Sequence, residues 1–214
     1  MIFNKVLNLV FSSSSHIAVL RALQNHKVGI TGREIARLSG LSPKTALHTL
    51  SELEDIKIVK RVIGGRDHHF TVNRENYLIK NGILPLLQAE NEFLPQLILL
   101  LKNKLSKYCI SIILFGSVAR NEETIESDLD ICFVVQNKKT QKIIISIVHE
   151  LQERIFNEYG ASLAPVYFTF EEFSKKAAKN LSPVNNIIKE GILISGKPIR
   201  IIAHGSQIKQ DKNR

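Results

Sequence analysis

The run FGSVARNEETIESDLDICFVV occupies residues 115–135 and decides the fold of the second half of the chain. Gly116 and Ser117 follow an apolar stretch at 110–115, and ten residues separate Ser117 from Asp128. Apolar residues resume directly after Asp130. This pattern predicts two strands, 110–115 and 131–135, with a turn or helix start at the glycine and two acidic residues where the second strand begins.

The residues at this bend suit a phosphate and a metal ion. Backbone N–H groups at a turn or helix start can bind a phosphate, and glycine leaves room for it to approach. Asp128 and Asp130 stand at i and i+2 of an extended segment, so their carboxylates point to the same face and offer the hard oxygens that Mg²⁺ prefers. A metal bridging them to a triphosphate would align the α-phosphate for attack. The simpler explanation is a turn followed by an exposed strand start.

The segments after residue 135 complete a mixed α/β layer. Apolar residues recur at helical spacing over 140–159, and 163–170 is a third β-rich run. We expect two further helices, over 170–179 and 185–194, to cover a face of the sheet.

Residues 115–135 resemble the GS-x10-DxD signature of the minimal nucleotidyltransferases, which belong to the polymerase-beta-type nucleotidyltransferase superfamily. The similarity extends over residues 105–199. It implies that Gly116 and Ser117 hold the β- and γ-phosphates of a nucleoside triphosphate and that Arg120 touches phosphate. It further implies that Asp128 and Asp130 are catalytic and ligate Mg²⁺, with ATP as the first candidate nucleotide.

One part of the family's pattern is missing. Members with demonstrated chemistry usually carry a third carboxylate on a later strand, where it acts as a general base or completes the metal site. Residues 161–169, which should hold it, contain no acid, and Ser162 or Ala164 stands nearest the expected place. Loss of a general base can lower a rate by orders of magnitude. The sequence therefore leaves open both an enzyme and a catalytically silent domain.

The first 75 residues predict three helices and a hairpin. Helices are expected over 16–23, over 31–40 after a Thr31–Glu34 capping box, and over 42–55 behind the pair Ser42-Pro43. Two β-rich runs, 56–63 and 66–72, flank a Gly-Gly turn. This order is typical of a winged helix-turn-helix.

This N-terminal segment resembles the winged helix-turn-helix of bacterial and archaeal regulators. The resemblance implies that the helix starting at Ser42 enters the major groove of DNA and that basic residues of the hairpin grip phosphates. The candidate base-reading residues are Ser42, Lys44, Thr45 and His48, and the candidate phosphate contacts are Lys60, Arg61 and, at the wing tip, Arg66. Such domains also serve as protein-interaction or dimerisation modules.

Composition agrees with a polyanionic partner. The 214 residues carry a formal net charge of +9, and residues 1–80 hold 12 Lys and Arg against 6 Asp and Glu. The two cysteines form no CxxC pair, and the apolar runs are far shorter than the roughly 20 residues that span a bilayer. We expect a reduced, cytoplasmic protein with no membrane segment.

These observations predict an α+β chain with a winged helix-turn-helix domain at 1–75 and a helical connector at 76–106, with breaks at Gly82, Pro85 and Pro95. A nucleotidyltransferase domain is expected at 107–203 and a disordered tail at 204–214. The leading hypothesis is a nucleotidyltransferase that uses a triphosphate and Mg²⁺ on an unknown acceptor and binds DNA through its winged helix. The competing hypothesis is a transcriptional regulator whose nucleotidyltransferase domain only senses nucleotide. A homodimer and a protein acceptor are compatible with both.

Overall fold

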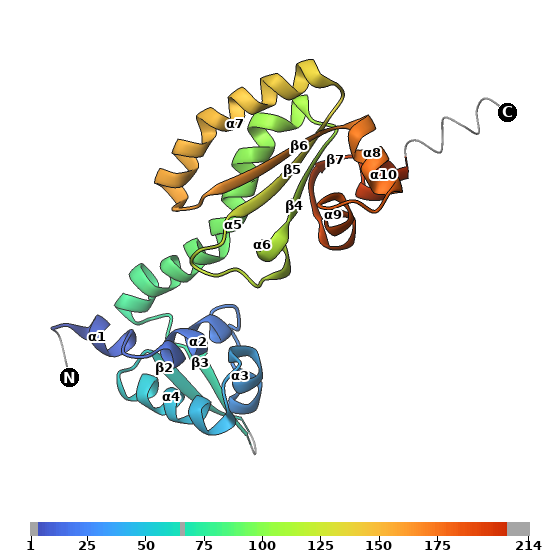
Figure 1. The fold of residues 1–214 in the computed structure, drawn as a ribbon. Coiled ribbons are helices and arrows are strands. Elements are labelled where there is room, and N and C mark those ends of the chain that lie inside the picture. The colour runs from blue at the N-terminus through green and yellow to red at the C-terminus, as the bar shows by residue number, and fades with distance from the viewer. Residues whose placement is uncertain (1–3, 65–66, 205–214) are drawn as a thin grey trace. The chain divides into compact units, whose positions relative to one another are not determined.

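The computed structural model describes residues 4–64 and 67–204 (Figure 1), and it is an α+β fold, as predicted. The chain divides into two compact units, Met1–Glu92 and Phe93–Arg214. Their boundary falls inside helix α5 (Leu84–Leu105), within the segment expected to be a helical connector. Within the described ranges, no helix combines the length and apolarity needed to cross a bilayer. The predicted tail lies outside the described residues except for His204, which ends helix α10.

The N-terminal unit has the predicted three helices and hairpin, preceded by a short helix, α1 (Val6–Val10), that was not predicted. The three helices are α2 (Ser14–Leu23), α3 (Gly32–Ser39) and α4 (Pro43–Asp55), and a π-helical turn, η1 (Ile79–Ile83), follows the hairpin. Strands β2 (Val59–Gly64) and β3 (Asp67–Val72) form the antiparallel hairpin. A third strand, β1 (Ile30–Thr31), pairs with β3 and was not predicted, because two residues are too few to show a period.

Side-chain caps start α3 and α4 where the sequence placed them. The Thr31 hydroxyl accepts the backbone N–H of Glu34, and the C-cap Gly40 has a φ of 68°. The reciprocal half of the predicted capping box is replaced by a salt bridge from the Glu34 carboxylate to Arg37. Helix α4 follows after a short turn, which is the arrangement that defines a helix-turn-helix.

The C-terminal unit is built on a four-stranded sheet with the order β6-β5-β4-β7. Strands β4 and β5 pair antiparallel, as do β4 and β7, whereas β5 and β6 are parallel. The strands are β4 (Ser111–Phe115), β5 (Leu129–Val135), β6 (Leu163–Thr169) and β7 (Ile192–Gly196). The helices are η2 (Ser106–Tyr108), α6 (Gly116–Arg120), α7 (Lys138–Tyr159), α8 (Phe170–Ala178), α9 (Val184–Glu190) and α10 (Ile199–His204).

Alternation along β5 divides the core between the two faces of this sheet. Ile131 and Phe133 pack with α5 and α7, whereas Cys132 and Val134 pack with α8, α9 and α10. Both faces are therefore covered by helices (Figure 1). By the same alternation, Asp130 belongs to the face covered by α8 to α10.

Two expectations differ from the structure. The helix expected over 185–194 ends at Glu190, and the following residues form β7 on β4. A short apolar run does not distinguish a strand from a helix, and here pairing with a buried strand decides. Pro95, expected to break the connector, lies inside α5.

Candidate functional site

A glycine-dependent bend joins β4 to α6. Strand β4 ends at Phe115, and Gly116 has a φ of 77°, in the left-handed region that favours glycine. A Cβ added at Gly116 would lie 2.1 Å from Oδ2 of Asp130. The missing side chain therefore makes room for this carboxylate, whereas the sequence suggested that it makes room for a phosphate.

The two aspartates lie beside this bend. Asp130 stands opposite Phe115 in the β4–β5 ladder. Leu129, between the aspartates, is buried, while Asp128 is exposed and Asp130 half-buried. Burial raises the pKa of Asp130 above its ordinary value, and repulsion from the Asp128 carboxylate raises it further. The pair is thus an acidic site in which a cation would relieve repulsion.

This donor set fits a divalent metal only in part. In the described ranges no cluster of three or more His, Cys, Asp or Glu could hold a metal ion. Mg²⁺, however, is usually bound by one or two carboxylates together with substrate phosphates and water. Asp128 and Asp130 therefore suit a metal that arrives with a triphosphate better than one that is bound permanently by protein ligands alone.

The strand beside Asp130 supplies no third acid. In the parallel β5–β6 ladder the residue opposite Asp130 is Ala164. This is one of the two positions that the sequence placed nearest the expected carboxylate. The register of β5 and β6 thus places an alanine beside Asp130, and β6 offers no general base to this site.

A different carboxylate, that of Glu190, contacts the site from helix α9. It ends α9, and β7 begins two residues later with Ile192 paired to Leu114. Its Oε1 accepts a 2.8 Å hydrogen bond from Nη1 of Arg120, and Glu122 accepts one of 2.7 Å from Nε. These two bonds raise the pKa of Arg120, whose positive charge in turn lowers the pKa of Asp130.

Sequence reasoning missed Glu190 because it treated residues 185–194 as one helix. The available signal was Gly191 between the helical run and an apolar triplet, which is typical of a helix end followed by a strand. Arg120, by contrast, was expected to touch phosphate, and the structure places it beside the bend and bound to two carboxylates.

On the second helix of the helix-turn-helix, the predicted base-reading residues are exposed but not equally available. The Ser42 hydroxyl accepts the backbone N–H of Thr45 at 3.1 Å and also contacts the Thr45 hydroxyl at 2.8 Å. Both hydroxyls therefore serve the helix cap. Lys44 is exposed and, within the described ranges, makes no ion pair.

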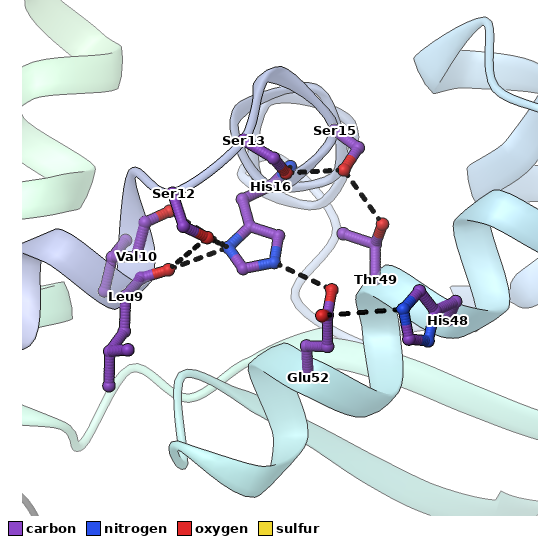
Figure 2. Close-up of polar contacts among 9 residues, drawn as sticks. All are labelled: Leu9, Val10, Ser12, Ser13, Ser15, His16, His48, Thr49 and Glu52. Carbon is purple, nitrogen blue, oxygen red and sulfur yellow. Dashed lines mark hydrogen bonds and ion pairs between the residues drawn. The ribbon is translucent and has the colours of Figure 1, made fainter.

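His48 is tied to the interior of its unit through Glu52 (Figure 2). One oxygen of Glu52 lies 3.5 Å from Nε2 of His48, and the other lies 3.1 Å from Nε2 of the buried His16. Nδ1 of His16 contacts the carbonyl oxygen of Leu9 at 3.0 Å. The side chain of His48 is 74% exposed, so it meets solvent from a helix face that this network anchors.

The predicted phosphate contacts on the hairpin are partly neutralised. Lys60 is paired with Glu75, and Nη2 of Arg61 lies 2.6 Å from Glu54. The Arg61 guanidinium also sits 5.3 Å from the centre of the Phe70 ring. Arg66 lies outside the described residues.

A groove of about 620 Å³ is lined by residues of α3, α4 and the β2–β3 hairpin. Arg33, Arg61 and His68 line it together with the acidic Asp67, and Ser51 adds a hydroxyl. Arg33 was not predicted as a contact, although its place in the first turn of an amphipathic helix made its exposure foreseeable. Arg33 thus adds a cationic side chain to those that the sequence singled out.

Comparisons with known proteins match both halves of the chain. Residues 96–199 match the family described as "Polymerase beta, Nucleotidyltransferase" and residues 13–60 the family described as "Winged helix-turn-helix DNA-binding". No curated protein matches the chain.

Two solved structures resemble part of the chain. One is a crystal structure of "the toxin-antitoxin with AMP-PNP" and is 17% identical in sequence to this chain; the other is a mutant of "the toxin-antitoxin MntA-HpeT" and is 15% identical. Each match covers 55% of this chain and 86% of the other, with a TM-score of 0.35. A TM-score this low bears on neither fold nor function.

Proposed function

We propose that this chain, which belongs to the polymerase-beta-type nucleotidyltransferases and carries a winged helix-turn-helix domain at its N-terminal end, transfers a nucleotidyl group from a nucleoside triphosphate to a hydroxyl acceptor. ATP and Mg²⁺ are the proposed nucleotide and metal. The observation that carries this proposal is the position of the Asp130 carboxylate against Gly116, at the bend where α6 begins.

Each residue at the bend has a role in this proposal. The first N–H groups of a helix lack intrahelical partners, so those of Gly116 and Ser117 bind the β- and γ-phosphates. Asp128 and Asp130 bind the divalent metal, which would neutralise phosphate charge and orient the α-phosphate. Arg120 supplies a second positive charge to the phosphates.

The proton of the acceptor hydroxyl has no acceptor on β6. Since Ala164 stands opposite Asp130, that strand holds no carboxylate where a general base would act. A base typically contributes about 10²–10⁴-fold to a rate. We therefore expect turnover to be slow unless the acceptor molecule contributes a base of its own.

Binding and transfer of labelled triphosphates test the proposal. Purified chain is mixed with Mg²⁺ and each of the four α-labelled ribonucleoside triphosphates, and with candidate protein and RNA acceptors. We expect binding that EDTA abolishes and that Asp128→Ala removes. The proposal is wrong if the chain binds none of the four, or if Asp128→Ala changes nothing.

The winged helix domain is proposed to bind DNA. Lys44 and His48, together with Ser42 and Thr45, would face the major groove, while Lys60, Arg61 and Arg66 would contact phosphates. The groove that contains Arg33 adds positive charge on the same unit. The affinity of the winged helix domain for DNA should fall steeply as the salt concentration rises, because contacts to phosphates release counterions.

A second candidate function is a transcriptional regulator whose nucleotidyltransferase domain binds nucleotide without turnover. The alanine opposite Asp130 favours it. Binding of ATP without transfer, accompanied by a change in DNA affinity, would support this function over the enzymatic one. Loss of all DNA binding at low salt would exclude it. In both proposals the protein is cytoplasmic. Both also allow the chain to form a homodimer and to act on a protein acceptor.

A further inference from the structure

Glu190 is a carboxylate beside the proposed nucleotide site that the chemistry above leaves without a role. Its bond to Arg120 joins residues 70 positions apart in the sequence, from α9 to α6. Glu190 therefore contacts one of the residues proposed to bind the triphosphate.

Packing holds Glu190 in this place. A Cβ on the next residue, Gly191, would lie 2.3 Å from the carbonyl oxygen of Ile187 and 2.8 Å from Cγ2 of Ile113. The chain thus turns tightly against β4 as α9 ends, and Ile187 is itself fully buried. The Glu190 carboxylate therefore belongs to a well-packed helix end and not to a mobile loop.

The pairing leaves Arg120 able to bind more. A guanidinium has five N–H donors, and two of those on Arg120 are engaged by Glu122 and Glu190, so three remain. Glu190 is the more buried partner, with 24% of its side chain exposed against 63% for Glu122. Its bond is therefore the less screened by solvent of the two.

We propose that Glu190 is a positioning residue that holds the Arg120 guanidinium in place for the phosphates of the bound triphosphate. This inference rests on the proposed function. A free arginine side chain loses rotamer freedom when it binds, and a partner that fixes it beforehand removes part of that cost. Glu190 acts through the hydrogen bond that it accepts, so an uncharged acceptor of the same shape should replace it.

Binding of AMP-PNP with Mg²⁺ to full-length variants tests this role. We expect Glu190→Ala to weaken binding by about tenfold, the size of effect that losing one charged hydrogen bond gives. Glu190→Gln retains an acceptor oxygen and should bind within about twofold of the wild type. The control is Glu158→Ala, which removes a carboxylate paired with Arg154 at the same 2.8 Å on α7 and should leave binding unchanged.

A double variant separates positioning from a general effect on the fold. If Glu190 acts through Arg120, then Arg120→Ala with Glu190→Ala should bind no more weakly than Arg120→Ala alone. Thermal unfolding of every variant shows whether the fold is intact. Should Glu190→Ala unfold, Glu190→Gln combined with Arg120→Lys still tests the coupling, because lysine offers no planar fork to be oriented.

Three outcomes overturn the inference. Unchanged binding in Glu190→Ala, or additive losses in the double variant, would show that Glu190 does not act through Arg120. Tighter binding in both Glu190 variants would show that the carboxylate competes with the phosphates. In these cases the proposed function stands, whereas a wild-type chain that binds no AMP-PNP contradicts the proposed function as well.

Discussion

Asp130 combines a cost in stability with a proposed role in metal binding. Its pKa is raised by burial and by the neighbouring Asp128 carboxylate. An aspartate whose pKa is higher in the folded chain binds protons more tightly when folded. The free energy of unfolding therefore falls as pH rises from the ordinary aspartate pKa through the raised one, and the cost is fully present at neutral pH.

Asp130→Asn should remove this cost and the function together. We expect its melting temperature at pH 7 to exceed that of the wild type, with the difference shrinking in acid. Metal-dependent triphosphate binding should be lost. Calorimetric melts across pH check the first expectation, and a variant less stable than the wild type at pH 7 would contradict it.

Gly116 is the second residue on which the site depends. In Gly116→Ala the new Cβ would collide with the Asp130 carboxylate, on a backbone with positive φ. We expect triphosphate binding to disappear and the melting temperature to fall.

The matched control for this change is Gly160→Ala. Gly160 also has a positive φ, 61°, but a Cβ there meets nothing within 4 Å. This variant should lose only roughly 1–2 kcal/mol of unfolding free energy, the cost of an alanine in the left-handed conformation, and should still bind triphosphate. Equal loss of binding in both variants would mean that contact with Asp130 is not the reason for the glycine.

At the scale of elements, a full capping box joins β6 to α8. The Thr169 hydroxyl accepts the backbone N–H of Glu172, and the Glu172 carboxylate accepts that of Thr169. Lys138 also pairs with Glu172. Hydrogen bonds from Lys138 and from Thr169 lower the pKa of the Glu172 carboxyl. Helix α8 is thereby fixed over the face of the sheet to which Asp130 belongs.

Thr169→Ala should cost about 1 kcal/mol of unfolding free energy, because it removes an N-cap acceptor. Urea unfolding measures the difference. Thr140→Ala is a suitable comparison, since it removes a hydroxyl that donates to the capping Asn137 but leaves the backbone N–H of residue 140 its acceptor. An equal or larger loss in Thr140→Ala would mean that capping does not explain the effect.

Across the whole molecule, residues 1–80 hold 12 Lys and Arg against 6 Asp and Glu, a net charge of +6 out of the chain's +9. Part of it is neutralised by local pairs such as Lys60–Glu75, whereas exposed Lys44 has no ion pair within the described ranges. Unpaired charges should therefore dominate the contacts to DNA phosphates.

Lys44→Ala should weaken DNA binding by about 1–3 kcal/mol and relax the sequence preference, as expected for a residue that contacts bases. Lys60→Ala should have a smaller effect, because its charge is already shared with Glu75. Fluorescence anisotropy of labelled duplex over a range of salt measures both. A larger effect of Lys60→Ala would show that its pair with Glu75 opens on DNA.

Most of the local structure could be predicted from the sequence alone. Helix caps at Thr31 and Ser42, the hairpin, and the bend at Gly116 followed from patterns within a few residues. Asp128 and Asp130 were expected on one face because the period of a strand is a local property. The caps, the hairpin and the bend were confirmed, because the interactions that decide them join neighbours along the chain.

Only the tertiary structure decided which distant segments meet at the site. The pairing of β7 with β4, the alanine opposite Asp130 and the bond between Glu190 and Arg120 depend on strand order and register. A short apolar run such as Ile192 to Ile194 becomes a strand because a buried neighbour needs hydrogen-bond partners, which no local pattern records. The space beside Gly116 is likewise filled by the Asp130 side chain because β4 and β5 pair in this register.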